Sequence, residues 1–295
     1  MLDKLEMFIA LAKEEHFGRA AISLGITQPT LSTGIKLLEE QLGVQLVFRG
    51  SRYGGLTPEG QNALVWARKI VSDSRQLKEE MRATRHGLSG QIRLAVVPTA
   101  LTWAAQLTSQ FTKAHPKLRV SILSRSSAQI LSMLDHLDAD AGITYLDNEP
   151  LGRVVTRPLY RERYMVVTPK DNPLAARDML EWADLSGQRL CLFTDDMQNR
   201  RILDRHLSDA GVSPEATVES NSIVVLVAHV EAGDWITVLP EGIARYLSRG
   251  TDLALVPIDP AGDGHRVGLV APFRDPHTPV LDALLGAAEK LSEID

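Results

Sequence analysis

The sequence is 295 residues long, and its 44% hydrophobic and 23% charged residues are typical of a folded globular protein with two or three compact units. A single cysteine excludes an internal disulfide framework and a cysteine-rich zinc site, and it fits a reducing compartment. The N-terminal residues lack the pattern of a secretory signal, and no stretch is long and apolar enough to span a bilayer. We therefore expect a cytoplasmic protein that does not associate with membranes.

The net charge of −5 is unevenly distributed along the chain. Residues 1–89 hold 12 Lys and Arg against 10 Asp and Glu, whereas the remainder holds 20 against 27. The first part is only weakly basic. Charge alone therefore does not indicate nucleic-acid binding.

Residues 1–60 have the pattern of short helices separated by tight turns. The first helix has apolar residues at i, i+3, i+4 and i+7, namely Leu5, Phe8, Ile9 and Ala12. A second short helix follows Gly18, and Gly25 is placed to end it. Thr27 is a suitable N-cap for a third helix, with Pro29 in its first turn and Gly43 at its end.

The third predicted helix is amphipathic. Its expected buried stripe consists of Leu31, Ile35, Leu38 and Leu42. Its opposite face is polar and consists of Gln28, Thr30, Ser32, Thr33 and Lys36. Short polar side chains at the start of a helix can enter the major groove of DNA, as in a helix-turn-helix protein. An ordinary helical bundle with a polar surface fits this pattern equally well.

A hairpin and a long helix follow. The segment 44–55 predicts a hairpin whose tip carries Arg49 and Arg52. Thr57-Pro58-Glu59 then opens a helix that extends to about Arg85. This helix has a heptad pattern typical of a dimer seam, formed by Ala63, Ala67, Ile70, Ser74, Leu77, Met81 and Thr84. Gly87–Gly90 is predicted to be a hinge.

From Gln91 onward, predicted strands alternate with predicted helices. The strands are expected at 92–97, 118–123, 141–144, 164–168, 190–193 and 235–239. This alternation predicts an α/β domain with parallel sheets flanked by helices.

The first sixty residues resemble the DNA-binding head of the LysR family of transcriptional regulators. The resemblance rests on Phe17-Gly18-Arg19-Ala20-Ala21, on residues 24–32, on 38–43, on Val47-Phe48-Arg49 and on 56–60, all in the family's order. Two positions depart from the family pattern. Thr33 stands where the family usually has an arginine, and Gly34 where it often has a longer polar residue. We therefore expect one base or phosphate contact to be missing.

The resemblance implies a winged helix-turn-helix domain at 1–58 and a dimerising linker helix with a hinge at 59–89. The implied DNA-binding residues are Arg19, Gln28, Pro29, Thr30, Ser32, Thr33, Lys36, Arg49 and Arg52. A symmetric dimer predicts an interrupted palindrome in double-stranded DNA as the operator. By the same resemblance we expect a homotetramer and contact with RNA polymerase.

Residues 90–295 resemble the effector domain of this family, which is similar to type 2 periplasmic binding proteins. Two α/β lobes are implied, with lobe I at 91–162 and 266–295 and lobe II at 163–265. The chain is expected to cross between them near 161–166 and 265–269. Ligands of such folds lie beyond the carboxyl ends of the strands, at helix N-termini.

Polar residues at these strand ends are the candidate effector site. They are Thr99, Ala100, Ser126, Ser127, Thr144, Asn199, Arg200 and Asn221. Their combination favours a small carboxylate or another anion as effector, with Asn199 and Arg200 recognising its charge. Each hydroxyl has a structural alternative as a helix N-cap, and each arginine has one as a salt-bridge residue.

The sequence contains no G-x-S-x-G, P-loop, G-x-G-x-x-G or H-E-x-x-H motif, so we expect no enzyme activity, cofactor or metal. Cys191 lies in an apolar strand and is expected to be a buried small hydrophobe. Two other functions remain open. The second half alone resembles a solute-binding protein, and a DNA-binding protein without an effector would share the head.

Overall fold

The computed structural model describes residues 1–48, 53–213, 215–259, 264–273 and 276–292. The chain divides into two compact units. The first comprises Met1–Leu88 with Asp135–Asp138 and Pro276–Pro279, and the second comprises Ser89–Leu134, Ala139–Asp275 and Val280–Asp295. None of the described helices combines the length and the apolar character that a bilayer span requires.

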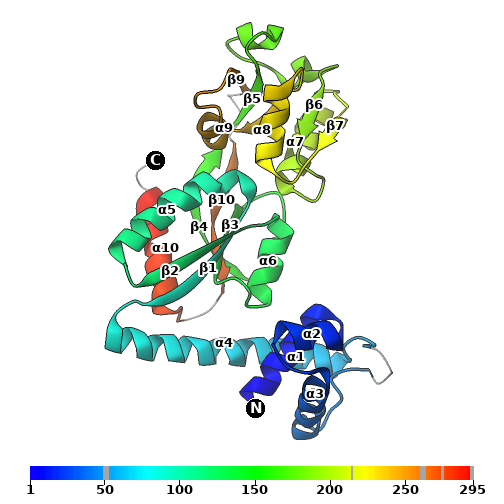
Figure 1. Cartoon of the computed structure of the whole chain (residues 1–295), viewed down its shortest axis with the longest axis vertical. Coiled ribbons are helices and arrows are strands. Elements are labelled where there is room, and N and C mark those ends of the chain that lie inside the picture. The colour runs from blue at the N-terminus through cyan, green and yellow to red at the C-terminus, as the bar shows by residue number, and fades with distance from the viewer. Residues whose placement is uncertain (49–52, 214, 260–263, 274–275, 293–295) are drawn as a thin grey trace. The chain divides into compact units, whose positions relative to one another are not determined.

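The first unit begins with three helices that pack on one another (Figure 1). They are α1 (Leu2–Glu14), α2 (Phe17–Ser23) and α3 (Gln28–Leu42). Thr27 caps α3 by accepting a hydrogen bond from the backbone N–H of Thr30, as predicted. Gly25 and Gly43 end α2 and α3 with φ of +66° and +71°, the left-handed conformation that favours glycine.

The core of this unit confirms most of the predicted stripe on α3. Leu31, Ile35 and Leu38 are buried, but Leu42 is 41% exposed because the helix ends there, beyond the packed surface. Gly34 is also buried, and it packs against Met7 of α1 so closely that a Cβ at this position would lie 2.3 Å from the Met7 sulfur. Gly34 therefore allows α1 and α3 to approach each other closely and does not belong to the polar face.

The long helix α4 (Pro58–His86) begins at the predicted cap. The Thr57 hydroxyl accepts a hydrogen bond from the N–H of Gly60 at 2.9 Å and donates to the carbonyl of Gln45 at 2.6 Å. Before it, a bridge between Val47 and Leu56 forms the base of the predicted hairpin, whereas Arg49 and Arg52 lie outside the described residues.

The predicted seam of α4 is divided between two faces. Ala67 is buried in the core of the head together with Val71, so it cannot belong to a dimer surface. A different apolar stripe is exposed to solvent and consists of Trp66, Ile70, Leu77 and Met81. Three of these four are predicted seam residues, and Trp66 extends the stripe at helical spacing.

Lobe I of the second unit is built on a five-stranded sheet with the order β2-β1-β3-β10-β4. The strands are β1 (Gly90–Val96), β2 (Leu118–Ser124), β3 (Ala141–Tyr145), β4 (Val154–Glu162) and β10 (His265–Pro272). In Figure 1, α5 (Leu101–Ala114) and α10 (Pro279–Ser292) lie on one side of this sheet and α6 (Ser127–Asp135) lies on the other. β1 runs parallel to β2 and β3, as predicted, whereas β10 is antiparallel to both its neighbours.

Lobe II contains two small sheets. One is antiparallel and consists of β8 (Thr237–Pro240), β5 (Tyr164–Pro169) and β9 (Leu253–Ile258). The other pairs β6 (Leu190–Leu192) with β7 (Ala216–Glu219) in parallel. Three helices complete this lobe: α7 (Gln198–Asp209), α8 (Ile223–Ala232) and α9 (Glu241–Leu247). The prediction of purely parallel sheets is therefore wrong for β10 and for the β8-β5-β9 sheet.

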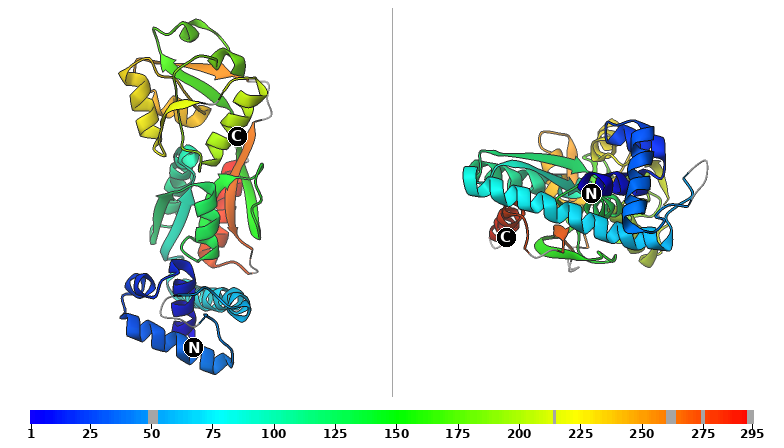
Figure 2. Two further views of the ribbon diagram at one scale, coloured as in Figure 1. Left: turned by 90° about the vertical axis from the view of Figure 1, so that its right-hand side faces the viewer. Right: turned by 90° about the horizontal axis from the view of Figure 1, so that it is seen from below.

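The chain passes between the lobes twice. The first crossing lies between the end of β4 at Glu162 and the start of β5 at Tyr164, within the predicted segment. At the second passage the lobe II strand β9 ends at Ile258, and His265–Pro272 already pairs with the lobe I strands β3 and β4, so the predicted crossing segment 265–269 belongs to lobe I. Figure 2 shows β10, in orange, within lobe I in its left view, as its pairing with β3 and β4 requires.

Candidate functional site

The polar face of α3 is open to solvent. Its exposed residues are Gln28, Pro29, Thr30, Ser32, Thr33 and Lys36. Thr30 contacts the Thr27 hydroxyl at 2.9 Å, and Lys36 lies 3.9 Å from Glu40. Arg19 on α2 is also exposed and donates to the carbonyl of Glu14 at 2.6 Å. This face therefore presents donors and acceptors above a well-packed core.

A second candidate site lies between the two lobes. A small cavity of about 10 Å³ opens there, roughly the room of one water molecule. Lobe I contributes Thr99, Ser127 and Tyr145, while lobe II contributes Gln198 and Asn199 from the first turn of α7. Apolar side chains complete its wall, namely Val97, Pro98, Phe193 and Met197.

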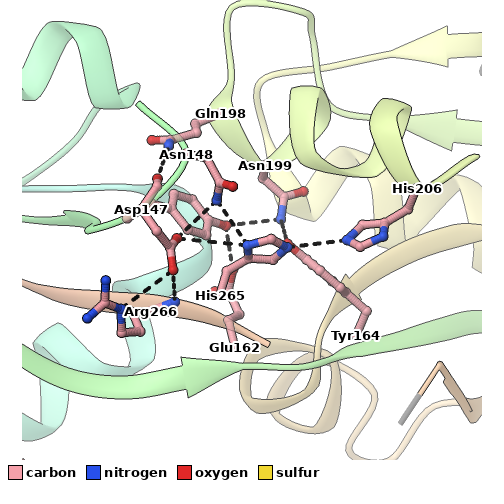
Figure 3. A network of polar contacts seen from close by, with 10 residues as sticks. Asp147, Asn148, Glu162, Tyr164, Gln198, Asn199, His206, His265 and Arg266 are labelled. Carbon is pink, nitrogen blue, oxygen red and sulfur yellow. Dashed lines mark hydrogen bonds and ion pairs between the residues drawn. The ribbon is translucent and has the colours of Figure 1, made fainter. Parts of the chain in front are cut away.

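A buried hydrogen-bond network lies beside this cavity, and Figure 3 shows part of it. The Tyr145 hydroxyl donates a very short hydrogen bond to the carboxylate of Glu162, and Tyr160 donates to the same carboxylate at 3.4 Å. The side-chain amide of Asn199 donates to the hydroxyls of Tyr145 at 3.1 Å and Tyr164 at 3.5 Å. Asn199 on lobe II is thus joined to Glu162 at the end of β4 through one tyrosine.

Burial dominates the electrostatics of this network. Glu162 is only 2% exposed, and its burial raises the pKa of the carboxyl to about 7, although hydrogen bonds from Tyr145, Thr99 and Tyr160 act in the opposite direction. Burial and the nearby Glu162 carboxylate also raise the pKa of Tyr145 well above its usual value. The tyrosine therefore stays protonated and keeps its proton directed at Glu162.

The turn after β3 connects the lobes at a second point. Gln198 donates its side-chain N–H to the carbonyl of Asp147 at 3.0 Å, and the Asp147 carboxylate accepts from the backbone N–H of Arg266 at 3.0 Å (Figure 3). Arg201 forms an ion pair with Glu149 at 2.6 Å. The first turn of α7 is therefore held to lobe I by several polar contacts.

A histidine pair lies beside the chain crossings. The Nε2 atoms of His206 on α7 and His265 on β10 are 3.2 Å apart, and the indole of Trp182 stacks on His206. Burial lowers the pKa of both histidines. A cavity of about 170 Å³ borders this pair, Glu162 and Tyr164. No group of three His, Cys, Asp or Glu is placed to hold a metal ion among the described residues.

The structure brings some of the predicted effector residues together and separates others. Thr99, Ser127 and Asn199 line the cavity. Thr144 is buried and donates to the Ser127 hydroxyl at 2.9 Å, so it supports the cavity from behind. The Ser126 hydroxyl accepts a hydrogen bond from the backbone N–H of Gln129, and the Gln129 side chain accepts one from the backbone N–H of Ser126. Ser126 therefore caps the start of α6, which is the structural role that the sequence left open for it. Ala100 is buried without lining the cavity, and Asn221 is exposed away from it.

Arg200, predicted to recognise the charge of an effector, has its partners within the protein. This side chain is only 8% exposed and pairs with Asp204 at 2.7 Å and with Glu219 at 2.6 Å, while it also donates to the carbonyl of Phe193. Burial alone would lower the pKa of Arg200, but hydrogen bonds to Glu219 and Asp204 raise it. Arg200 therefore neutralises two carboxylates within lobe II and does not line the cavity.

Tyr145, Glu162 and Gln198 were not predicted as site residues. Tyr145 follows Thr144 at the end of β3, and Gln198 precedes Asn199 at the start of α7. The expectation that ligands lie at strand ends and helix N-termini, which selected Thr144 and Asn199, therefore applies to Tyr145 and Gln198 as well. No comparable signal marks Glu162. Its burial depends on the pairing of β4 with β10 and on contact with Tyr145 of β3 and Tyr160 of β4.

Comparison with known proteins agrees with this architecture. The LysR substrate binding domain matches residues 85–292, and the bacterial regulatory helix-turn-helix protein of the lysR family matches residues 2–61. Over 237 residues the chain is 31% identical to the hydrogen peroxide-inducible genes activator of Dickeya chrysanthemi, covering 80% of this chain and 77% of that protein. It is 29% identical to the transcriptional regulator XapR of Escherichia coli over 246 residues, covering 83% of each.

Solved structures show the same fold over nearly the whole chain. A full-length OxyR variant from Pseudomonas aeruginosa superposes with a TM-score of 0.74 at 25% identity, covering 98% of this chain and 94% of that one. The regulator CbnR in complex with its target DNA superposes with a TM-score of 0.60 at 19% identity, covering 99% of both chains, which shows the likeness in fold. The chain belongs to the LysR family of DNA-binding transcriptional regulators, with a helix-turn-helix domain followed by a substrate-binding domain.

Proposed function

We propose that this regulator reads an operator with the polar face of α3 and is switched by a small effector bound between lobes I and II. The observation that carries the proposal is the cavity shared by Tyr145 and Asn199, one from each lobe, in a chain that also holds an exposed recognition face. A ligand in this cavity contacts both lobes and can therefore favour one arrangement of them over another.

The DNA contacts follow from the exposed face of the head. Gln28 can pair bidentately with adenine, while Thr30, Ser32, Thr33 and Lys36 supply contacts to bases or phosphates. Pro29 fixes the first turn of α3, and the exposed Arg19 side chain can contact a DNA phosphate. Arg49 and Arg52 would add contacts as a wing.

Dimerisation is proposed through the exposed stripe of α4. Trp66, Ile70, Leu77 and Met81 form an apolar surface that a second copy of the helix would cover. A two-fold dimer places two recognition helices on half-sites about one helical turn of DNA apart, or a multiple of it. Assembly into a homotetramer and contact with RNA polymerase belong to the same proposal.

The proposed switch is a population shift. Because Asn199, Gln198 and Arg201 on α7 hold lobe II to lobe I, a ligand that alters these contacts changes the balance between lobe arrangements. The ligand needs different affinities for the two arrangements, since equal affinity shifts nothing however tight it is. The helix α4 joins this domain to the head along the chain.

Selection of genomic DNA fragments by the purified protein at a fixed moderate salt concentration tests the proposal. We expect a few enriched sites that share an interrupted palindrome. The double variant Gln28→Ala, Ser32→Ala should lose the enrichment while retaining its thermal unfolding. Equal enrichment by the wild type and this variant, or no enrichment over random DNA, would contradict the proposed role of α3.

A thiol-based response to peroxide is a second candidate, because several relatives are named hydrogen peroxide-inducible genes activators. The chain argues against an internal disulfide switch. Cys191 is the single cysteine in the sequence, it is fully buried in β6, and burial raises the pKa of its thiol to about 11. A neutral, buried thiol reacts slowly with oxidants. We therefore propose reversible ligand binding as the switch.

A further inference from the structure

The interlobe cavity is poor in positive charge. None of its nine lining residues, all of them described, is a lysine or an arginine. Two of the three arginines of α7 are paired with carboxylates, Arg200 with Asp204 and Glu219 and Arg201 with Glu149. The third, Arg205, is exposed and does not line the cavity. An anion entering the cavity would therefore lose its hydration without gaining a cationic partner among the lining side chains.

The interlobe cavity also contains a buried hydrogen-bond acceptor that has no donor among the described residues. Asn199 lines the cavity and is 4% exposed, and its Oδ1 atom has no hydrogen-bond partner in the described part of the chain. A buried carbonyl oxygen without a donor costs free energy until a donor reaches it. Asn199 is therefore prepared to accept a hydrogen bond from a ligand.

The neighbouring tyrosine fixes the orientation of the Asn199 amide. Tyr145 directs its only hydroxyl proton at the Glu162 carboxylate, so its oxygen can only accept from other groups. Asn199 must then present its NH₂ to Tyr145 and its carbonyl oxygen elsewhere. The free acceptor is thus a consequence of the Glu162–Tyr145 hydrogen bond.

Glu162 adds to this selectivity through its charge. Its carboxylate is buried directly behind Tyr145, and the interior transmits its field with little screening. Because burial raises its pKa to about 7, this carboxyl is ionised above that pH, where its negative charge repels an anion and attracts a cation or the positive end of an N–H or O–H dipole. Charge and hydrogen-bond geometry therefore favour the same kind of ligand.

We propose that the interlobe cavity selects a ligand group that donates N–H or O–H hydrogen bonds and carries no negative charge, with Asn199 Oδ1 as its acceptor. This inference rests on the proposed function, in which this cavity binds the effector. It differs from the anionic effector expected from the sequence, because none of the described lysine or arginine side chains lines the cavity. With a volume of about 10 Å³, the cavity has room for about one water molecule in this arrangement of the lobes, so a larger ligand requires the lobes or the lining side chains to move.

Three planar probes of the same shape test the proposal: acetate, acetamide and acetamidinium. They differ in charge and in the number of donors. The full-length protein is titrated with each at constant ionic strength up to about 50 mM, since ligands of so few heavy atoms bind weakly. We expect acetamide or acetamidinium to raise the Tm in a saturable manner and acetate to match a sodium chloride blank. An equal or larger effect of acetate, or no effect of any probe, would overturn the proposal.

Variants assign the effect to the cavity. Asn199→Asp replaces the amide with a carboxylate, so it should weaken acetamide and strengthen acetamidinium by several-fold each. Asn221→Asp makes the same chemical change at an exposed position outside the cavity and should respond as the wild type does. Glu162→Gln should reduce the preference for acetamidinium over acetate. Identical responses of the Asn199 and Asn221 variants would exclude Asn199 as the acceptor.

The outcomes also separate this inference from the proposed function. If acetate binds and Asn199→Asp abolishes its binding, the cavity is a ligand site but the ligand class is wrong. If no probe binds while genomic fragments are still selected, DNA recognition stands and the proposed ligand chemistry fails. Loss of fragment selection by the wild type would instead contradict the proposed function itself.

Discussion

The recognition face of α3 and the interlobe cavity use polar side chains in opposite ways. On α3 the short polar residues Gln28, Ser32 and Thr33 point into solvent, and their partners would come from DNA. At the cavity Tyr145 and Asn199 are buried, and Tyr145 links Asn199 to the buried Glu162 behind it. The exposed set can be changed without disturbing the fold. Any change in the buried set alters stability and ligand binding together.

The largest expected effect concerns Glu162. Its folded pKa of about 7 exceeds the unfolded value of 4.5, so its stabilising contribution is complete below pH 4.5 and is lost as the pH rises through 7. The loss amounts to about 3 kcal/mol. Glu162→Gln lacks this titration, and its stability relative to the wild type should increase by that amount between pH 4.5 and 7.

Chemical denaturation of both proteins across this pH range measures the difference. His206 and His265 are present in both proteins, so their own titrations largely cancel in the comparison. A stability difference that does not vary with pH would show that Glu162 titrates alike in the folded and unfolded states.

On the exposed face, loss of one base contact should weaken DNA binding without unfolding. Gln28→Ala should cost about 2 kcal/mol at a site with adenine in register, roughly a 30-fold loss of affinity. Fluorescence anisotropy with a selected operator measures it at fixed salt. Gln41→Ala, also exposed on α3 but near its C-terminal end, is the matched control and should bind as the wild type does. An equal loss in both variants would refute base reading by Gln28.

A smaller effect is expected where the recognition helix meets α1. Gly34→Leu places a Cβ against the sulfur of Met7, and overpacking should outweigh the gain in helix propensity, for a net loss of about 1–2 kcal/mol. Gly286 in α10 has open space around its Cα, so Gly286→Leu should be neutral or slightly stabilising. Equal Tm changes in the two variants would mean that Met7 does not restrict position 34.

The smallest expected effect is at the cap of α4. Thr57→Ala removes the acceptor for the N–H of Gly60 and the donor to the Gln45 carbonyl, and it should lower stability by about 1 kcal/mol. Thr57→Ser keeps the hydroxyl and should recover most of the loss. Thermal unfolding of the two variants side by side decides whether the hydroxyl or the methyl group is responsible.

The sequence predicts well what neighbouring residues determine. Thr27, Thr57, Gly25 and Gly43 act through their own helix ends, and their predicted roles are confirmed. Leu42 was misplaced because periodicity continues to the helix end, whereas the packed surface stops earlier.

The burial of Ala67 and the ion pairs of Arg200 were not predicted because their partners lie elsewhere in the sequence. Ala67 packs into the core of the head, and Arg200 pairs with Glu219 from β7. Glu162 could not have been predicted, since only the assembled sheet buries it. Sequence spacing therefore reveals exposed faces and caps, while buried networks depend on tertiary pairing.

The central claim is that the interlobe cavity controls the DNA-binding head. We would measure the affinity and the footprint of wild type, Asn199→Asp and Asn221→Asp on a selected operator at one salt concentration. We expect Asn199→Asp, which alters a contact between the lobes, to change operator affinity or footprint length, whereas Asn221→Asp should not. Identical binding by all three proteins would contradict the claim.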